Sequence, residues 1–259
     1  MTSVAPTVCK ALGVRLPSSA EGSPINEVAE SIHQIERLAV VVIDAFGVST
    51  WRKVKAKTPA FNKLRDLHGT VIRSVMPSIT PVNFATMLTG ASPMVHGIRD
   101  REQPLMHETI FDVLRETGKL SATAARAKSS LGILISPHAD RPGVAASNLD
   151  TEVTEIACRM IDEDVNLLWV QLLDVDDAGH AHGPHSLESE EASGRADANL
   201  RVILDAARVK GYSIMVLADH GQHPSSDGHY KGVHGTDMSE DLNVPFLWAN
   251  NTELIDALG

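Results

Sequence analysis

The segments LAVVVID (residues 38–44), LLWVQLLD (residues 167–174) and SIMVLAD (residues 213–219) are apolar runs that each end in an aspartate. Continuous apolar runs are typical of strands that are buried on both faces of a parallel sheet. In an open α/β sheet, ligands bind beyond the carboxyl ends of the strands. We therefore expect Asp44, Asp174 or Asp176, and Asp219 to gather at one edge of the sheet, where three converging carboxylates indicate a cation.

Strand-like and helix-like segments alternate along the rest of the chain. Strands are predicted at Leu38–Asp44, Val71–Met76, Leu131–Ser136, Asn166–Leu173, Tyr212–Ala218 and Val244–Ala249. Helices are predicted at Asn26–Arg37, Thr58–Leu67, Asn83–Leu88, His107–Thr117, Thr151–Asp164 and Leu187–Lys210. This alternation predicts an α/β fold in which helices cover both faces of a mainly parallel sheet.

The length of 259 residues suits one large domain. Residues 1–24 are rich in Ser, Pro, Ala and Gly and are interpreted as an N-terminal extension, so the main domain is placed at residues 25–259. Hydrophobic residues make up 43% and charged residues 22%, which is ordinary globular usage and excludes a disordered or fibrous chain.

The formal charge of -10 disfavours binding to nucleic acid polymers or to anionic lipid. Every apolar run is shorter than the roughly 20 residues that cross a bilayer, and no secretory signal is recognised at the start. Two cysteines, Cys9 and Cys158, provide no disulfide framework. We therefore expect a cytoplasmic protein with no membrane partner, and the sequence leaves its oligomeric state open.

Seven of the twelve histidines lie between His180 and His234. Any one of them alone would more often face water or satisfy a local hydrogen bond than bind a metal. Clustered after strands that end in aspartate, they indicate metal ligands. Asp and His suit Zn2+ or Mn2+, imidazole favours zinc, and the lack of cysteine ligands points to an open catalytic site. The sequence sorts the ligands into two sets, one for each of two ions: Asp176, His180 and His234, and Asp44, Asp219 and His220.

The segment SVMPSITPVNFATMLTG (residues 74–90) offers a nucleophile, because Thr80 lies just ahead of a predicted helix and helix starts bind anions. A threonine hydroxyl is protonated at neutral pH, but a divalent cation lowers the pKa of bound water from 15.7 to about 7, and an alkoxide gains in the same way. Without metals, Thr80 would be an ordinary helix cap. With them, Thr80 becomes both a metal ligand and the attacking group.

Five motifs, in chain order, resemble the alkaline phosphatase superfamily and, within it, the nucleotide pyrophosphatase/phosphodiesterase branch. They are VVVIDAFG (residues 40–47), PSITPVNFATMLTGASPMVHGI (77–98), DVDDAGHAHGP (174–184), LADHGQ (217–222) and VHGTD (233–237). The resemblance implies a three-layer α/β/α sandwich, Thr80 as nucleophile, Asn83 as a donor to a phosphoryl oxygen, and two zinc ions on the six Asp and His residues. The family spacing Asp-x-x-x-His selects Asp176 over Asp174 and Asp177.

The resemblance implies metal-dependent hydrolysis of a small phosphate ester through a covalent phospho-threonine. The ester could be a phosphodiester, a nucleotide pyrophosphate or a phosphomonoester. Two alternatives stay open, a phosphonate hydrolase or phosphomutase of the same superfamily, and a non-catalytic metal- or phosphate-binding protein. A dianionic monoester would need an extra cation, and the candidates are Arg99, Arg101, Arg126, Lys128 and Arg141. His96 is interpreted as a group that fixes its loop.

Overall fold

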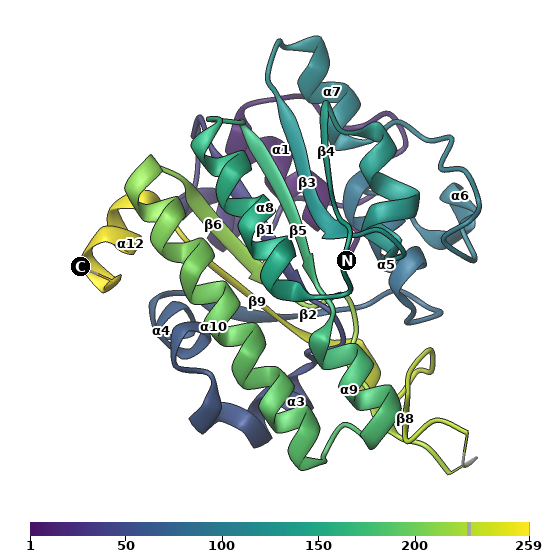
Figure 1. Cartoon of the computed structure of the whole chain (residues 1–259). Helices are drawn as coiled ribbons and strands as arrows, with labels where there is room; N and C mark the ends of the chain where they lie inside the picture. The colour runs from purple at the N-terminus through teal and green to yellow at the C-terminus, as the bar shows by residue number, and fades with distance from the viewer. Residues whose placement is uncertain (227–228, 259) are drawn as a thin grey trace.

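The computed structural model describes residues 1–226 and 229–258, so residue 259, the predicted end of the main domain, lies outside the described residues. Its centre is a seven-stranded sheet in the order β2-β9-β6-β1-β5-β3-β4 (Figure 1). The strands are β1 (Leu38–Ile43), β2 (Gly69–Arg73), β3 (Ser121–Arg126), β4 (Arg141–Ala145), β5 (Leu167–Leu172), β6 (Ser213–Leu217) and β9 (Asn243–Ala249). Strand β9 is antiparallel to β2 and to β6, and the other pairs in this sheet are parallel, which confirms the predicted mainly parallel α/β fold.

Strand β1 occupies the middle of the sheet and sets the edge at which the site forms. It pairs in parallel with β5 and with β6, and Leu38 faces both Leu167 and Ser213. All six residues of β1 are buried, as its continuous apolar run predicts. Because the three strands are parallel and in register, the residues that follow them emerge side by side at the carboxyl edge of the sheet.

Helices cover both faces of the sheet. Figure 1 shows α8 and α10 on the viewer's side of the strands and α1 behind them. The helices are α1 (Val4–Leu12), α2 (Asn26–Ser31), α3 (Val48–Val54), α4 (Pro59–Leu67), α5 (Thr80–Thr89), α6 (Pro93–His96), α7 (Ile110–Glu116), α8 (Asp150–Asp162), α9 (Asp174–His182), α10 (Leu187–Lys210), α11 (Ser239–Leu242) and α12 (Asn251–Leu258). Within the described residues, none of them is long and apolar enough to span a membrane.

Helix α1 lies within the segment that the sequence analysis set apart as an extension. Eight of its nine residues are buried, and they include Val4, Val8 and Leu12. These side chains join the same hydrophobic core as the strands of the sheet. The Pro- and Ser-rich composition around the helix concealed its apolar face, so the packed core begins earlier in the chain than residue 25.

The prediction of a strand at Leu131–Ser136 is wrong. Residues Leu131–Ile135 form one turn of π-helix, and the neighbouring strands are β3 and β4. A short apolar run does not distinguish a buried strand from a buried helical turn. The sequence of β3, SATAAR, consists mostly of small residues that rarely signal a strand, yet all six are buried at its place beside β5.

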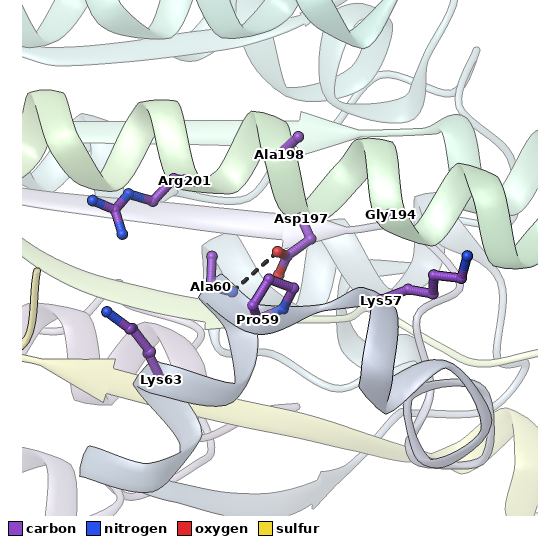
Figure 2. A pocket seen from close by; sticks show the side chains of 8 residues that line it. All are labelled: Lys57, Pro59, Ala60, Lys63, Gly194, Asp197, Ala198 and Arg201. Atoms are coloured by element: carbon purple, nitrogen blue, oxygen red, sulfur yellow. Dashed lines mark hydrogen bonds between the residues drawn. The ribbon is translucent and has the colours of Figure 1, made fainter.

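A carboxylate of α10 fixes the start of α4. Asp197 accepts hydrogen bonds from the backbone N–H of Ala60 (3.0 Å) and of Phe61 (2.8 Å), which have no partner within their own helix. Figure 2 shows the bond from Ala60 to Asp197 among the residues that line a pocket of about 350 Å3. Lys63 and Arg201 extend on one side of Asp197 and Lys57 on the other. The pocket shares no lining residue with the candidate metal-binding cluster of Asp and His residues described below.

Candidate metal centre

The carboxyl edge of the sheet brings distant parts of the chain together. Asp44 follows β1, Asp219 and His220 follow β6, and α9, which carries Asp176 and His180, begins directly after β5. Since β1 lies between β5 and β6, these residues emerge next to one another. His234 comes from the loop after the two-residue strand β8 (Gly232–Val233), which pairs with β7 (His223–Pro224).

Asp44, Asp219 and His220 form a buried triad whose ligand atoms all lie within 4.8 Å of one another. The His220 Nε2 atom is 3.5 Å from Asp44 Oδ1 and 3.4 Å from Asp219 Oδ2. Among the described residues, Asp44 Oδ1 and Asp219 Oδ2 are buried oxygens without a hydrogen-bond donor. Two such oxygens facing one imidazole nitrogen are suited to hold a cation, because a buried carboxylate needs a partner.

The second set of predicted ligands lies beside the first. The i, i+4 spacing on α9 places Asp176 and His180 on one face of the helix, with Asp176 Oδ1 3.4 Å from His180 Nε2. His234 Nε2 lies 3.3 Å from His180 Nε2 and 3.8 Å from Asp176 Oδ1. Asp176, His220 and His234 also lie within 4.8 Å of one another, so His220 stands between the two sets.

All three imidazoles are oriented in the same way. Each Nδ1–H donates to a backbone carbonyl: that of Gly232 for His180, Gly221 for His220 and Ser78 for His234, at 2.8, 3.1 and 3.0 Å. This fixes the neutral tautomer with its lone pair on Nε2, and the Nε2 atoms converge. Carbonyl acceptors of this kind are what orient metal-binding histidines in known sites. Burial also lowers the pKa of His220, and it lowers the pKa of His234 to about 4, so both stay neutral.

Two carboxylates of the first set show the opposite shift. Burial and, second, the neighbouring charge of Asp176 raise the pKa of Asp219 to about 7. The pKa of Asp44 also lies well above its ordinary value, through burial and then through the charges of Asp219 and Asp176. Such shifts mean that the ionised cluster is costly without a positive charge among the carboxylates. The orphaned oxygens, the oriented imidazoles and the raised pKa values all fit two divalent ions.

Thr80 is the first residue of α5, where Pro81 in the first turn suits a helix start. Its hydroxyl lies 3.0 Å from His220 Nε2, and since that nitrogen carries the lone pair, the hydroxyl donates. The predicted nucleophile is thus in direct contact with a predicted metal ligand.

Asn83 is fully buried one turn further along α5. Its carboxamide accepts from the backbone N–H of Val75 (3.0 Å) and donates to the carbonyl of Ile79 (3.2 Å). These bonds fix the loop that carries Thr80. The predicted contact of Asn83 with a phosphoryl oxygen stays a proposal.

Two glutamines that the sequence analysis did not single out support the carboxylates. Gln171 Nε2 donates to Asp44 Oδ2, and Gln222 Nε2 donates to Asp176 Oδ1, both at 2.6 Å. Both side chains are buried. Gln171 interrupts the apolar run of β5, and a polar residue inside such a run was the available signal. Gln222 gave no signal beyond its place three residues after Asp219.

One candidate cation for the substrate is already engaged. Arg126 is 4% exposed and makes ion pairs with three carboxylates, those of Asp150, Asp174 and Asp177. Asp174 and Asp177 flank Asp176 on α9, so Arg126 secures the helix that carries two predicted ligands. Asp174 and Asp177 are thus directed towards Arg126, whereas Asp176 is directed towards His180.

His96 makes the contacts of a group that fixes its loop. Its Nδ1 accepts from the backbone N–H of Ile98 (3.1 Å), so its Nε2–H donates to the hydroxyl of Thr86 in α5 (3.0 Å). The side chain is buried, and neither Ile98 nor Thr86 belongs to the candidate metal-binding cluster.

Comparison with known proteins places this geometry in a family. The family model described as type I phosphodiesterase/nucleotide pyrophosphatase matches residues 38–249. A pyrophosphatase/phosphodiesterase of Schizosaccharomyces pombe, itself described as uncharacterised, is 26% identical over 220 residues, which are 73% of this chain and 45% of that protein. The chain therefore spans about half the length of this relative.

Solved structures share the fold. Murine ectonucleotide pyrophosphatase/phosphodiesterase 5 superposes with a TM-score of 0.66 at 15% identity, over 86% of this chain and 94% of that one. Phosphonoacetate hydrolase of Sinorhizobium meliloti 1021, in complex with phosphonoformate, superposes with a TM-score of 0.58 at 20% identity, over 75% and 59%. The family match covers all the residues of the candidate metal-binding cluster, and we conclude that the chain belongs to the type I phosphodiesterase/nucleotide pyrophosphatase family.

Proposed function

We propose that this protein is a two-metal hydrolase of small phosphate esters that uses Thr80 as its nucleophile. The observation that carries the proposal is the 3.0 Å contact between Thr80 Oγ1 and His220 Nε2, at the point where six Asp and His side chains converge. An ordinary helix cap would bond to the backbone N–H of its own first turn. The hydroxyl of Thr80 is directed at a ligand atom instead.

The two ions would be held by Asp44, Asp219, His220 and Thr80 on one side, and by Asp176, His180 and His234 on the other. Zinc fits this donor set best, with Mn2+ as the alternative, because imidazole nitrogen and carboxylate oxygen suit both and no thiolate is present. When bound, the ions supply charge that stabilises an alkoxide and the phosphoryl oxygens.

In the proposed reaction, Thr80 Oγ forms a bond to phosphorus while the bond from phosphorus to the leaving oxygen breaks. The hydroxyl proton passes to solvent, and the leaving alcohol or phosphate takes up a proton. The product is a phospho-threonine, which water then hydrolyses to regenerate Thr80 and release the phosphoryl product. The start of α5 lies against the reacting group, where helix amides favour negative charge.

The substrate class is tested by comparing initial rates on three aryl esters: bis(p-nitrophenyl) phosphate, p-nitrophenyl phosphate and p-nitrophenyl phenylphosphonate. Each is measured with Zn2+, with Mn2+ and after chelation. We expect metal-dependent turnover of a phosphate ester. Faster turnover of the phosphonate ester would favour the phosphonate hydrolase alternative. Absence of turnover from protein that holds two ions would favour the non-catalytic binding protein.

A further inference from the structure

Gln222 contacts α9 at Asp176, the first of the two proposed metal ligands on that helix. The side chain is 2% exposed. Its Nε2 donates to Asp176 Oδ1 at 2.6 Å and to the backbone carbonyl of Asp176 at 3.3 Å. The carboxamide therefore holds both the main chain and the side chain of one residue, and Oδ1 is the oxygen that faces His180 and His234.

Gly179 makes room for this contact. A Cβ atom on Gly179 would lie 1.7 Å from Gln222 Oε1 and 2.8 Å from its Cδ. Glycine costs roughly 1 kcal/mol relative to alanine inside a helix, so its presence in the middle of α9 needs a reason. Among the described residues, the atoms nearest to that Cβ position all belong to Gln222, and the space is thus reserved for the carboxamide.

The chemistry of the donor suits a metal ligand. A carboxylate oxygen has more than one lone pair, so it can accept an N–H and still bind a cation. A lysine or arginine at this position would compete with the ion through its charge, whereas a neutral amide orients the carboxylate without that competition. Gln171 provides the same kind of donor to Asp44, where its bond to Oδ2 leaves Oδ1 without a donor. Each set of ligands therefore has one carboxylate held by one glutamine.

We infer that Gln222 is a positioning residue that sets the affinity of the Asp176/His180/His234 ion, and that Gly179 is glycine in order to admit it. This inference rests on the two-metal site of the proposed function. It predicts different effects on the two ions, because Gln222 contacts the carboxylate of Asp176 and Gln171 contacts that of Asp44.

The first test measures Zn2+ affinity by competition with a chelating indicator in two single-ion proteins. Asp44→Asn leaves the ion of Asp176, and Asp176→Asn leaves the ion of Asp44. Gln222→Met keeps the side-chain volume but removes the donor. We expect it to weaken the Asp176 ion about 10- to 100-fold, the usual effect of losing such a partner, and to leave the Asp44 ion unchanged. Gln171→Met is the matched control and should show the opposite pattern.

Equal affinity of the Asp176 ion with and without Gln222→Met would overturn the inference while leaving the proposed function intact. Equal losses at both ions would also overturn it, because they would mean general disturbance of the fold. Failure of the wild-type protein to bind two ions would count against the proposed function itself.

The second test needs no metal. Gly179→Ala and Gln222→Ala are combined in a double-mutant cycle, with thermal unfolding followed in the presence of chelator. We expect Gly179→Ala to lower the unfolding temperature of the wild type, because its methyl group displaces the carboxamide. In the Gln222→Ala background the same change should be neutral or stabilising, as alanine normally is in a helix. Identical shifts in both backgrounds would show that Gly179 does not serve Gln222.

Discussion

The hydroxyl of Thr80 lies 3.0 Å from the Nε2 atom of His220, although 140 residues separate them in the chain. The carbonyl of Gly221 accepts the Nδ1–H of His220, so the Nε2 lone pair faces the threonine and the two buried carboxylates. A divalent ion placed at this lone pair would lie within reach of the hydroxyl oxygen. This single contact links the helix that carries the proposed nucleophile to the strand end that carries the proposed ligands.

Replacing Thr80 should therefore lower the rate of ester hydrolysis without changing the metal content. We expect Thr80→Ala to lower turnover of the preferred aryl ester at least about 1,000-fold, since loss of a nucleophile removes the covalent route. Thr80→Ser keeps the hydroxyl and should retain measurable turnover. Metal analysis of each variant serves as the control and should still find two ions, because the Asp and His ligands remain. Undiminished turnover by Thr80→Ala would refute its assignment.

Loss of one carboxylate should remove one ion. Asp219 contributes an orphaned buried oxygen to the set that contains Asp44 and His220. We expect Asp219→Asn to hold about one zinc ion per chain after gel filtration, measured by inductively coupled plasma mass spectrometry, because an amide is a much weaker ligand than a carboxylate. Asp205→Asn changes a partly exposed aspartate on α10 and should keep both ions. Two ions in the Asp219 variant would exclude Asp219 as a ligand.

Arg126 should matter to stability far more than a surface arginine. Removing it leaves Asp150 fully buried without its cation. Breaking a buried ion pair in this way typically costs about 3–5 kcal/mol, so we expect Arg126→Met to lower the free energy of unfolding in urea by that amount. Arg141, whose pair with Glu163 is exposed, is the matched control, and Arg141→Met should cost at most about 1 kcal/mol. Similar losses in both variants would contradict this account of the cluster.

His96 should make the protein sensitive to acid. Burial lowers its pKa from 6.5 to about 4, with smaller effects from His107 and Arg99. Between pH 6.5 and pH 4, His96 is therefore protonated in the unfolded chain but neutral in the folded protein. Neutral His96 contributes its full stabilisation above pH 6.5, and this stabilisation is lost as the pH falls towards 4. A pKa difference of this size corresponds to up to about 3 kcal/mol, at ~1.4 kcal/mol per unit. Unfolding temperatures of wild type and His96→Gln, compared from pH 7 to pH 4, should converge on acidification. A constant difference would exclude His96 as the cause.

Much of the site was predictable because its residues follow strands that are easily recognised in the sequence. The runs that end at Asp44 and Asp219 are buried, β-branched and continuous, and parallel topology alone brings their ends together. The spacing from Asp176 to His180 predicts a shared helical face. These signals are local, so the sequence carries them.

What the sequence did not predict depends on tertiary packing. The small residues of β3 form a strand because β5 and β4 supply hydrogen bonds on both sides, whereas the apolar run at Leu131–Ile135 forms a π-helical turn. The role of Gln222 depends on the absence of a side chain at Gly179, 43 positions away in the chain. The acid cluster around Arg126 likewise appears only when β3 meets α9. Such contacts leave no periodic pattern.

Asp197 provides the last prediction, because it stabilises α4 from another helix. Pro59 suits the first position of α4, and the N–H groups of Ala60 and Phe61 donate to the carboxylate of Asp197. Burial raises the pKa of Asp197, and these two backbone donors act against that shift. Loss of a helix cap costs about 0.5–2 kcal/mol, so Asp197→Ala should lower the free energy of unfolding in urea by that amount without changing metal content. Asp66→Ala, an exposed aspartate near the other end of α4, should have almost no effect. If both variants unfold at the same urea concentration as the wild type, the carboxylate does not hold the helix start.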